Sequence, residues 1–207
     1  MRMATSCNRL EGRTFAYNFG MSTYCDIAPG HPVHGPHHEF EHGFPAKSDD
    51  ELFARLMLEV NQAGLSWEIV LKKRETLYAA YAGFAIDTVA DYGEDDRARL
   101  LADPGIIRNR LKVNAAIENA KKIQVLREQH GSFAAWLDEH HPRSKPEWVK
   151  LFKKTFKFTG GEIVGEFLMS TGYLPGAHNE DCPVFTKVLA RSPAWALPVT
   201  RNPPARN

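Results

Sequence analysis

Cysteine, long apolar runs and excess charge are all scarce in this chain of 207 residues. Its three cysteines, Cys7, Cys25 and Cys182, are too few and too widely spaced for a disulfide framework, which leaves them available to bind a metal. No apolar run approaches the roughly 18 residues that span a bilayer, and residues 1–20 lack the apolar centre of a secretory signal. We therefore expect a cytoplasmic protein.

The net charge is only +1, so the overall composition demands no nucleic-acid partner. Basic residues are nevertheless clustered, with six between Arg143 and Lys157 opposed only by Glu147, and a second run at residues 72–74. Such clusters are compatible with phosphate contacts. A solvated helix face is the simpler explanation for either cluster alone.

The middle of the chain has helical periodicity. Ser48 followed by Glu51 is a capping-box signal, apolar residues then recur at helical spacing from Leu52 to Val60, and Gly64 ends the run. Because no segment indicates a β-hairpin, the predicted fold class is all-α. Further helices are expected over residues 66–81, 86–92, 95–101, from about 112 onward, 148–152 and 162–171.

One folded domain is expected over residues 25–190. Residues 1–24 show no sustained period and are expected to form a loose N-terminal extension, and residues 191–207 a flexible proline-rich tail. The stretch 25–45 is rich in glycine, proline and histidine and is expected to be an irregular but ordered loop.

Four residues have the chemistry and spacing of a metal site. His38 follows Cys25 by thirteen residues, and far downstream His178 and Cys182 form a His-x3-Cys pair. Two thiolates and two imidazoles complete a tetrahedral zinc shell and leave no open position for catalysis. Spacing alone leaves an alternative, because the segment 31–42 holds five histidines, any of which can be a surface residue.

A carboxylate lies at the edge of the first predicted apolar stripe. At ~100° per residue, Glu59 falls about 20° from Leu52 on the helix, where a charge is costly unless it is paired or useful. A boundary glutamate that reaches water is the simpler interpretation. The turn that follows presents Gly64, Leu65 and Trp67, residues that can enter a base stack and stack on a base, or else belong to the core.

A Pro-Gly turn joins two predicted helices between Asp103 and Asn109. Such a turn exposes backbone N–H groups, and the following helix N-terminus favours an anion. Arg108, Arg110 and Lys112 add positive charge nearby. The geometry suits a DNA backbone, although many helix pairs are joined in this way.

Together these segments resemble the DNA-3-methyladenine glycosylase I family of the helix–hairpin–helix glycosylases, from Cys25 to Cys182. The most specific stretch is Leu58–Glu75, which is similar to the family's Leu-Glu-x-x-Gln-Ala-Gly-Leu-Ser-Trp followed by Leu-Lys-Lys-Arg. The segments Gly105–Lys112 and Phe156–Gly160 also match. The resemblance implies a monofunctional, monomeric hydrolase that removes 3-methyladenine or a related alkylated base from duplex DNA in base-excision repair.

The resemblance also implies roles for individual residues. Glu59 would contact the extruded cationic base as the catalytic carboxylate, and Trp67 would stack on it. Gly64 and Leu65 would fill the gap in the duplex. Backbone contacts would come from Gly105, Arg108 and Lys112, and a structural zinc would be bound by Cys25, His38, His178 and Cys182.

The chain departs from the family pattern around the base site. His34 and His37 stand where the family has tyrosines, His42 where it has tryptophan, and Glu166 where it has a serine. We expect His37, His42 and Glu166 to lie at the base. Imidazoles titrate near neutral pH, and two glutamates in one pocket raise at least one pKa. 3-Methyladenine remains the first candidate substrate, and another cationic lesion the second.

Two other functions fit parts of the sequence. The lost aromatic residues allow a DNA-damage-binding module that keeps the fold without cutting. A zinc hydrolase that uses the histidine-rich loop would need an open coordination position, which four protein ligands do not leave.

Overall fold

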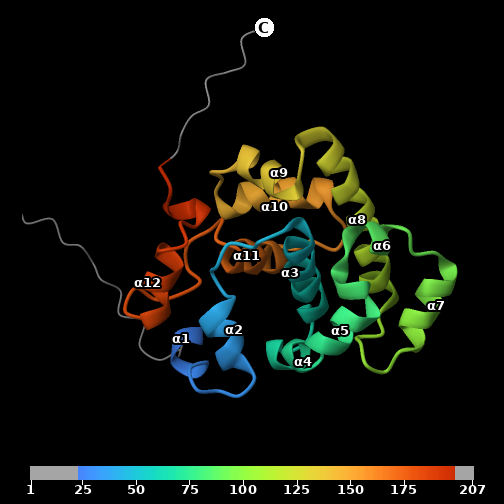
Figure 1. Ribbon diagram of the computed structural model, residues 1–207, viewed down its shortest axis with the longest axis horizontal. Helices are drawn as coiled ribbons and strands as arrows, with labels where there is room; N and C mark the ends of the chain where they lie inside the picture. The colour runs from blue at the N-terminus through green and yellow to red at the C-terminus, as the bar shows by residue number, and fades with distance from the viewer. Residues whose placement is uncertain (1–22, 199–207) are drawn as a thin grey trace, which may run out of the picture.

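The computed structural model describes residues 23–198, and all regular structure in that part of the chain is helical, which confirms the predicted all-α class (Figure 1). The elements are α1 (Tyr24–Ile27), α2 (His34–Phe40), α3 (Asp49–Gln62), α4 (Trp67–Lys72), α5 (Arg74–Ala80), η1 (Ala82–Phe84), α6 (Ile86–Ala90), α7 (Glu94–Ala102), α8 (Arg110–His130), α9 (Phe133–His140), α10 (Lys145–Thr155), α11 (Gly161–Ser170), α12 (Pro183–Leu189) and η2 (Ala194–Ala196).

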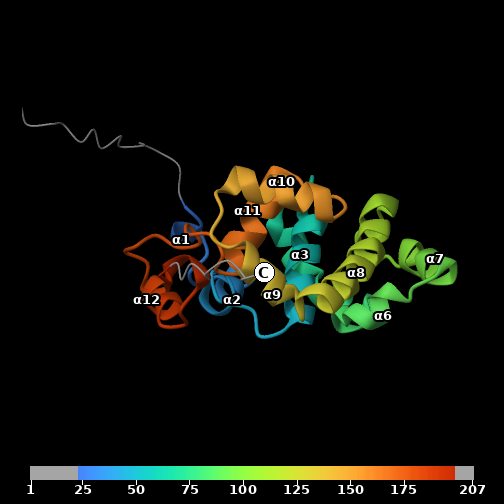
Figure 2. The same cartoon turned by 90° about the horizontal axis from the view of Figure 1, so that it is seen from above.

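Helix α3 forms the centre of the molecule and begins at the predicted cap, where the Ser48 hydroxyl accepts a hydrogen bond of 3.1 Å from the Glu51 backbone N–H (Figures 1 and 2). It packs against α4, α8, α9 and α11. Because neighbours cover it on several sides, all residues from Leu52 to Asn61 are buried. The expectation that Glu59 is a boundary residue reaching water is therefore wrong.

A cluster of aromatic side chains joins α9, α10 and α11. The Phe133 ring lies 5.5 Å from Phe156 and 6.2 Å from Phe167, and Phe152 lies 5.7 Å from Trp136 and also from Phe167. Aromatic burial of this kind contributes strongly to a core. It fixes α11, which carries Glu166, against the rest of the bundle.

The N-terminus of α3 is also tied to two distant helices by one carboxylate. Asp49 accepts hydrogen bonds from the backbone N–H groups of Phe133 (2.9 Å) and Ala134 (3.1 Å), and from Arg127 Nε (3.0 Å). Because these donors lie at the start of α9 and the end of α8, the contact sets where α3 enters the core.

Several predicted helix boundaries need correction. The single helix expected over 66–81 is two helices, because Lys73 has φ −97° and ψ 5° and interrupts the turn. The stretch 25–45 is not wholly irregular, since it contains α1 and α2. Helices α9 and α12 were missed, and α10 begins at Lys145, three residues before its expected start, at a Ser144–Glu147 capping box.

The ends of the domain also differ from expectation where the structure describes them. Residues 1–22 and 199–207 lie outside the described part, but Tyr24, placed in the loose extension, begins α1. In the expected tail, Trp195 donates a backbone hydrogen bond of 3.2 Å to Gly172 O and its ring lies 6.2 Å from Phe185. No helix within residues 23–198 is both long and apolar enough to cross a membrane.

Candidate functional site

A cavity of about 350 Å³ lies between the N-terminal helices α1 and α2 and the central helices α3, α4 and α11. This volume is in the range of small-molecule sites. The cavity brings together all five residues that the sequence placed at a base, Glu59, Trp67, His37, His42 and Glu166. The remaining lining residues are Tyr24, Ile27, His34 and Gln62.

A second hollow, of about 530 Å³, shares Glu59 and Glu166 with this cavity. It lies between the turn after α3 and the start of α11, and its lining includes Gly64, Leu65 and Gly160. Gly64 has φ +79°, a conformation that favours glycine, and the Leu65 side chain is 39% exposed. The cavity therefore shares a wall with the hollow at which the expected duplex-contacting residues lie.

Glu59 is buried within the cavity without a partner. Glu59 is only 6% exposed, and within residues 23–198 no hydrogen bond or ion pair joins its side-chain carboxyl to another residue. Burial first, and then the charge of Glu166, raise the pKa of Glu59 well above 4.5. The pKa of Glu166 is also raised by burial, although Lys145 opposes the rise. Two carboxyl groups in one enclosed space favour a cationic ligand.

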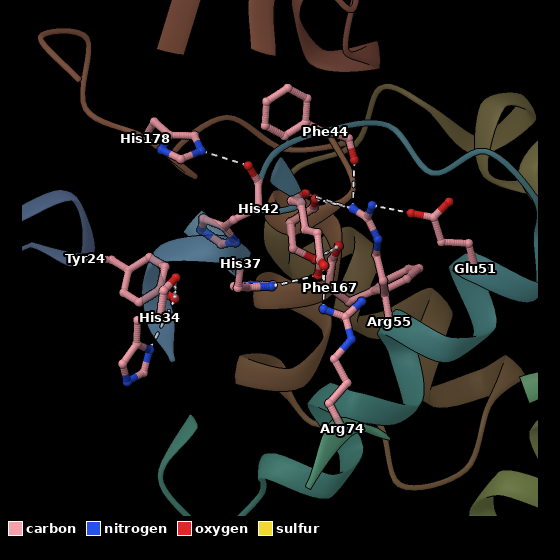
Figure 3. Close-up of polar contacts among 12 residues, drawn as sticks. Tyr24, His34, His37, His42, Phe44, Glu51, Arg55, Arg74, Phe167 and His178 are labelled. Carbon is pink, nitrogen blue, oxygen red and sulfur yellow. Dashed lines mark hydrogen bonds and ion pairs between the residues drawn. The ribbon is translucent and has the colours of Figure 1, made fainter. Parts of the chain in front are cut away.

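The opposite wall is formed by imidazoles. Burial lowers the pKa of both His37 and His42, which favours their neutral forms. His37 Nδ1 lies 3.1 Å from Glu41 (Figure 3). Burial opposes ionisation of Glu41, but hydrogen bonds from His37 and Arg74 outweigh it and lower its pKa to about 2. Because an ionised carboxylate only accepts, Nδ1 donates, and the neutral ring keeps Nε2 as an acceptor.

Tyr24 is a lining residue that the sequence did not identify. Its ring lies 5.5 Å from His42 and 5.7 Å from His34, and its hydroxyl is 3.3 Å from His34 Nδ1. Burial raises the pKa of Tyr24 to about 12, which keeps its hydroxyl protonated. The phenol supplies an aromatic surface on the wall where three aromatic positions have become histidines. Its place directly before Cys25 was the available signal.

Arg55 and Glu41 are the other residues that the sequence missed. The Arg55 guanidinium is buried and donates to the backbone oxygens of Glu41 (3.0 Å), Phe44 (2.8 Å) and Ser170 (3.0 Å) (Figure 3). It thereby ties the segment that carries His42 to the end of α11. Its position one helical turn before Glu59 placed it on the same face, but its partners are distant in sequence.

The four expected metal ligands converge at the junction of the N- and C-terminal segments. The ligand atoms of Cys25, His38, His178 and Cys182 all lie within 4.8 Å of one another. The distances from Cys25 Sγ to His178 Nδ1 and from Cys182 Sγ to His38 Nε2 and His178 Nδ1 are 3.7–3.8 Å. Tetrahedral zinc, with bonds of about 2.3 Å to sulfur and 2.0–2.1 Å to nitrogen, separates such atoms by about 3.6 Å. The donor set and its spacing therefore fit a metal ion.

One of these ligands is connected to the cavity wall. His178 Nε2 lies 2.7 Å from the His42 backbone oxygen (Figure 3), so Nε2 carries the proton. The other ring nitrogen, Nδ1, lies 3.7 Å from Cys25 Sγ and 3.8 Å from Cys182 Sγ. The Cys/His cluster is therefore hydrogen-bonded, through the His178 side chain, to the backbone of His42 in the cavity wall.

The Pro-Gly hairpin is fixed by polar contacts. Asp103 Oδ1 accepts from the Gly105 N–H (2.7 Å), and Lys73 Nζ donates to the backbone oxygens of Pro104 and Gly105 (3.0 Å each). A side chain at Gly105 would place its Cβ 2.9 Å from that Asp103 oxygen. Arg108 is exposed beside the hairpin, in a position from which it can reach a phosphate.

Lys112 lies elsewhere than expected. It is only 4% exposed, and its ammonium donates hydrogen bonds of 2.7 Å to the backbone oxygens of Asn61 and Ala63. The last carbonyl groups of a helix lack intrahelical partners. Lys112 therefore caps the end of α3 and positions the Gly64 turn. Its burial is at odds with the expected contact to DNA.

The all-helical fold and its cavity with two carboxyl groups are those expected of a DNA-base glycosylase. The family model described as methyladenine glycosylase matches residues 28–186, and the chain belongs to this family.

Named relatives agree with this assignment. DNA-3-methyladenine glycosylase 1 of Escherichia coli (strain K12) is 34% identical over 168 residues, covering 72% of this chain and 89% of that protein. DNA-3-methyladenine glycosylase of Haemophilus influenzae (strain ATCC 51907 / DSM 11121 / KW20 / Rd) is 31% identical over 185 residues, covering 80% of this chain and 100% of that protein. A crystal structure of a tyrosine-to-phenylalanine variant of 3-methyladenine DNA glycosylase I in complex with 3-methyladenine aligns with a TM-score of 0.71 and 29% identity, covering 78% and 96% of the two chains.

Replacing Lys112 separates its capping role from DNA contact. Lys112→Met should lower the free energy of unfolding by about 2–4 kcal/mol, because two buried carbonyl groups lose a charged donor. The dependence of DNA binding on salt should stay unchanged. The control Arg108→Met should leave stability unchanged and reduce the slope of log affinity against log salt by about 0.9, the value for one phosphate contact. The reverse pattern, measured by urea unfolding and salt titration, would return Lys112 to the DNA interface.

The pKa of Glu59 predicts how stability depends on pH. Folding raises the pKa of Glu59 above 4.5. The wild type is therefore destabilised as the pH rises from about 4.5 through the pKa of the folded state. The loss is about 1.4 kcal/mol for each pH unit that separates the two pKa values. Glu59→Gln escapes this loss. Its melting temperature should match the wild type near pH 4 and exceed it at pH 7. A variant that is less stable than the wild type at both pH values contradicts the shift.

Proposed function

We propose that this chain is a monofunctional DNA glycosylase that hydrolyses the N-glycosidic bond of 3-methyladenine, or of a related cationic base, in duplex DNA. The observation that carries the proposal is the buried Glu59 carboxyl, unpartnered in a cavity that Trp67 also lines. A family relative has been solved with 3-methyladenine bound. Discrimination follows from charge, because a buried carboxylate attracts a methylated cationic base more strongly than neutral adenine.

The reaction requires little chemical activation from the protein. The bond between C1′ and the base nitrogen breaks, its electron pair neutralises the positive charge of the base, and water bonds to C1′ and loses a proton. The alkylated base is already a good leaving group. The residues of this chain would therefore extrude, hold and orient it, with Trp67 stacking on the ring and Glu59 facing its charge.

Other parts of the cavity support hydrolysis and base recognition. No lysine lines the cavity in the part of the chain that the structure describes, which favours attack by water over attack by an amine. The acceptor Nε2 of His37 complements an amino group of the base. We propose that the protein acts as a monomer and that Gly64, Leu65, Gly105 and Arg108 contact the duplex.

An excision assay tests this function directly. Duplex DNA methylated to contain 3-methyladenine is incubated with the protein, and the released bases are separated and identified. We expect the wild type to release 3-methyladenine, and Glu59→Gln to be about 10–100-fold slower, the worth of one hydrogen bond to a charged group. Glu128→Gln, which changes an exposed glutamate on α8, should be unaffected.

One result would contradict the proposal, and a second would then identify the alternative function. Folded wild-type protein that releases no base after prolonged incubation excludes a glycosylase. If that protein also retains tight binding to methylated duplex, the damage-binding module becomes the better account.

We also propose that Cys25, His38, His178 and Cys182 hold a structural zinc ion. Their two thiols and two imidazoles match the donor set and spacing of a closed tetrahedral site. When bound, zinc would cross-link the start of the domain to its C-terminal segment, and the contact from His178 to the His42 carbonyl would transmit that restraint to the cavity.

Loss of one ligand tests the metal assignment. Purified wild-type protein should contain one zinc per chain by elemental analysis. Cys182→Ser should lose most of it, with a fall in melting temperature of ~10 °C or more, since zinc binding contributes folding free energy. The matched variant Cys7→Ser should retain both values. Full zinc content in Cys182→Ser would show that the ion is bound elsewhere.

A further inference from the structure

The turn between α10 and α11 is held in place by side-chain hydrogen bonds. The buried side-chain amide of Asn119 in α8 makes two hydrogen bonds to the backbone of Lys157, donating to its oxygen (3.1 Å) and accepting from its N–H (2.7 Å). The Thr159 hydroxyl donates to the Phe156 oxygen at 3.3 Å. The residue between these anchors, Phe158, therefore has a fixed backbone.

Phe158 has an unfavourable backbone conformation that core packing does not explain. Its φ is +59°, a region that bulky residues rarely occupy. Phe84 also has a positive φ, but it is fully buried and packed against other aromatic rings. Phe158 is 37% exposed. Strain retained at an exposed position is characteristic of functional sites, where the surrounding structure maintains it.

The position of Phe158 connects it to the base cavity. Gly160, Gly161 and Ile163 line the outer hollow across from Leu65, and this hollow shares Glu59 with the cavity. Two peptide units separate Phe158 from Gly160, so their Cα atoms lie within about 8 Å. The exposed Leu65 (39%) lines one side of the hollow, and the exposed Phe158 (37%) lies two residues before Gly160, which lines the hollow at the start of α11.

The surface beside Phe158 is positively charged. Lys153, Lys154 and Lys157 are exposed, and no ion pair involves any of them within residues 23–198. Their charges suit the phosphates of a strand that runs along α10. An exposed apolar residue beside cations, two residues from a glycine that lines the hollow, is complementary to duplex DNA, whose phosphates suit the lysines and whose base steps accept an aromatic ring.

We propose that Phe158 is a second residue that enters the base stack, opposite Leu65, when the damaged nucleotide moves into the cavity. This inference rests on the proposed glycosylase function and extends it to how the duplex is opened. A residue whose backbone is fixed before binding loses little backbone freedom on insertion, and its ring would stack on the base next to the vacated position. Asn119 acts as a positioning residue through the Lys157 backbone.

Replacing Phe158 by glycine separates insertion from folding. Glycine removes the ring and also relieves the positive φ, so Phe158→Gly should melt at or above the wild-type temperature. Its single-turnover excision of 3-methyladenine from duplex DNA should fall about tenfold or more, by analogy with the worth of one base–aromatic stack. Phe158→Leu, which keeps an apolar side chain, should retain most of the activity. The control Val125→Ala, at a position of 38% exposure on α8, should change nothing.

Two further readouts distinguish insertion from a structural role. Free 3-methyladenine should bind Phe158→Gly as it binds the wild type, because the inner cavity is intact. On single-stranded methylated DNA, which has no paired stack to open, the variant should excise as fast as the wild type.

The outcomes are distinct from those that test the glycosylase itself. An active wild type together with a Phe158→Gly variant that excises from duplex DNA within about twofold of it would overturn the proposal. Equal losses on duplex DNA, single-stranded DNA and free base would assign Phe158 to the structure of the cavity and would also overturn it. A wild type that releases no base from any substrate would instead refute the glycosylase function.

Discussion

The cavity depends on one buried carboxyl group, that of Glu59, which has no cationic partner within residues 23–198. Cations lie close to Glu59 in the sequence and in the fold, but each is committed elsewhere. Arg55, one helical turn earlier, donates to three backbone oxygens, and Lys112 caps the end of α3. An unpaired carboxyl in such a place is costly to ionise, which is why its pKa is raised. A cationic base would provide the missing partner and favour ionisation of Glu59. The carboxyl group would therefore select a charged base over a neutral one.

The shape of the cavity depends on contacts between distant parts of the chain. Arg55 joins the segment before α3 to the end of α11, and the His178 side chain contacts the His42 backbone near the Cys/His cluster. Glu41, bonded to Arg74 of α5, orients His37. The cavity walls are thus supported by polar contacts from distant parts of the chain. Such support is expected where a ligand must meet preorganised groups.

Local patterns predicted the parts of the site that are continuous in sequence. Ser48 and Glu51 marked the start of α3, and the segment Leu58–Glu75 placed Glu59 and Trp67 beside a glycine turn. The convergence of Glu166 with Glu59 came from the family resemblance, because α11 follows α3 by about a hundred residues and periodicity carries no information on such contacts.

The features that the sequence did not predict have one physical cause. Tertiary contacts override the usual preference of a residue type for the surface, the core or a helix. Lys112 was expected at a phosphate because lysine is usually exposed, yet two carbonyl groups draw it inward. Tyr24 was placed in a loose extension because its partners, four imidazoles, become neighbours only when the chain folds. The break at Lys73 was hidden within a stretch of good helix formers.

The most direct measurement compares two small ligands that share the adenine ring, one of them a cation and the other neutral. Adenine methylated on both N3 and N9 remains a cation, whereas 9-methyladenine is neutral, and the binding of each can be followed by calorimetry. We predict that the wild type binds the cation at least about tenfold more tightly, as one charge-assisted hydrogen bond would give. We also predict that Glu59→Gln abolishes most of this preference. Equal affinity of the wild type for the two ligands would contradict the central claim that the buried carboxyl selects a charged base.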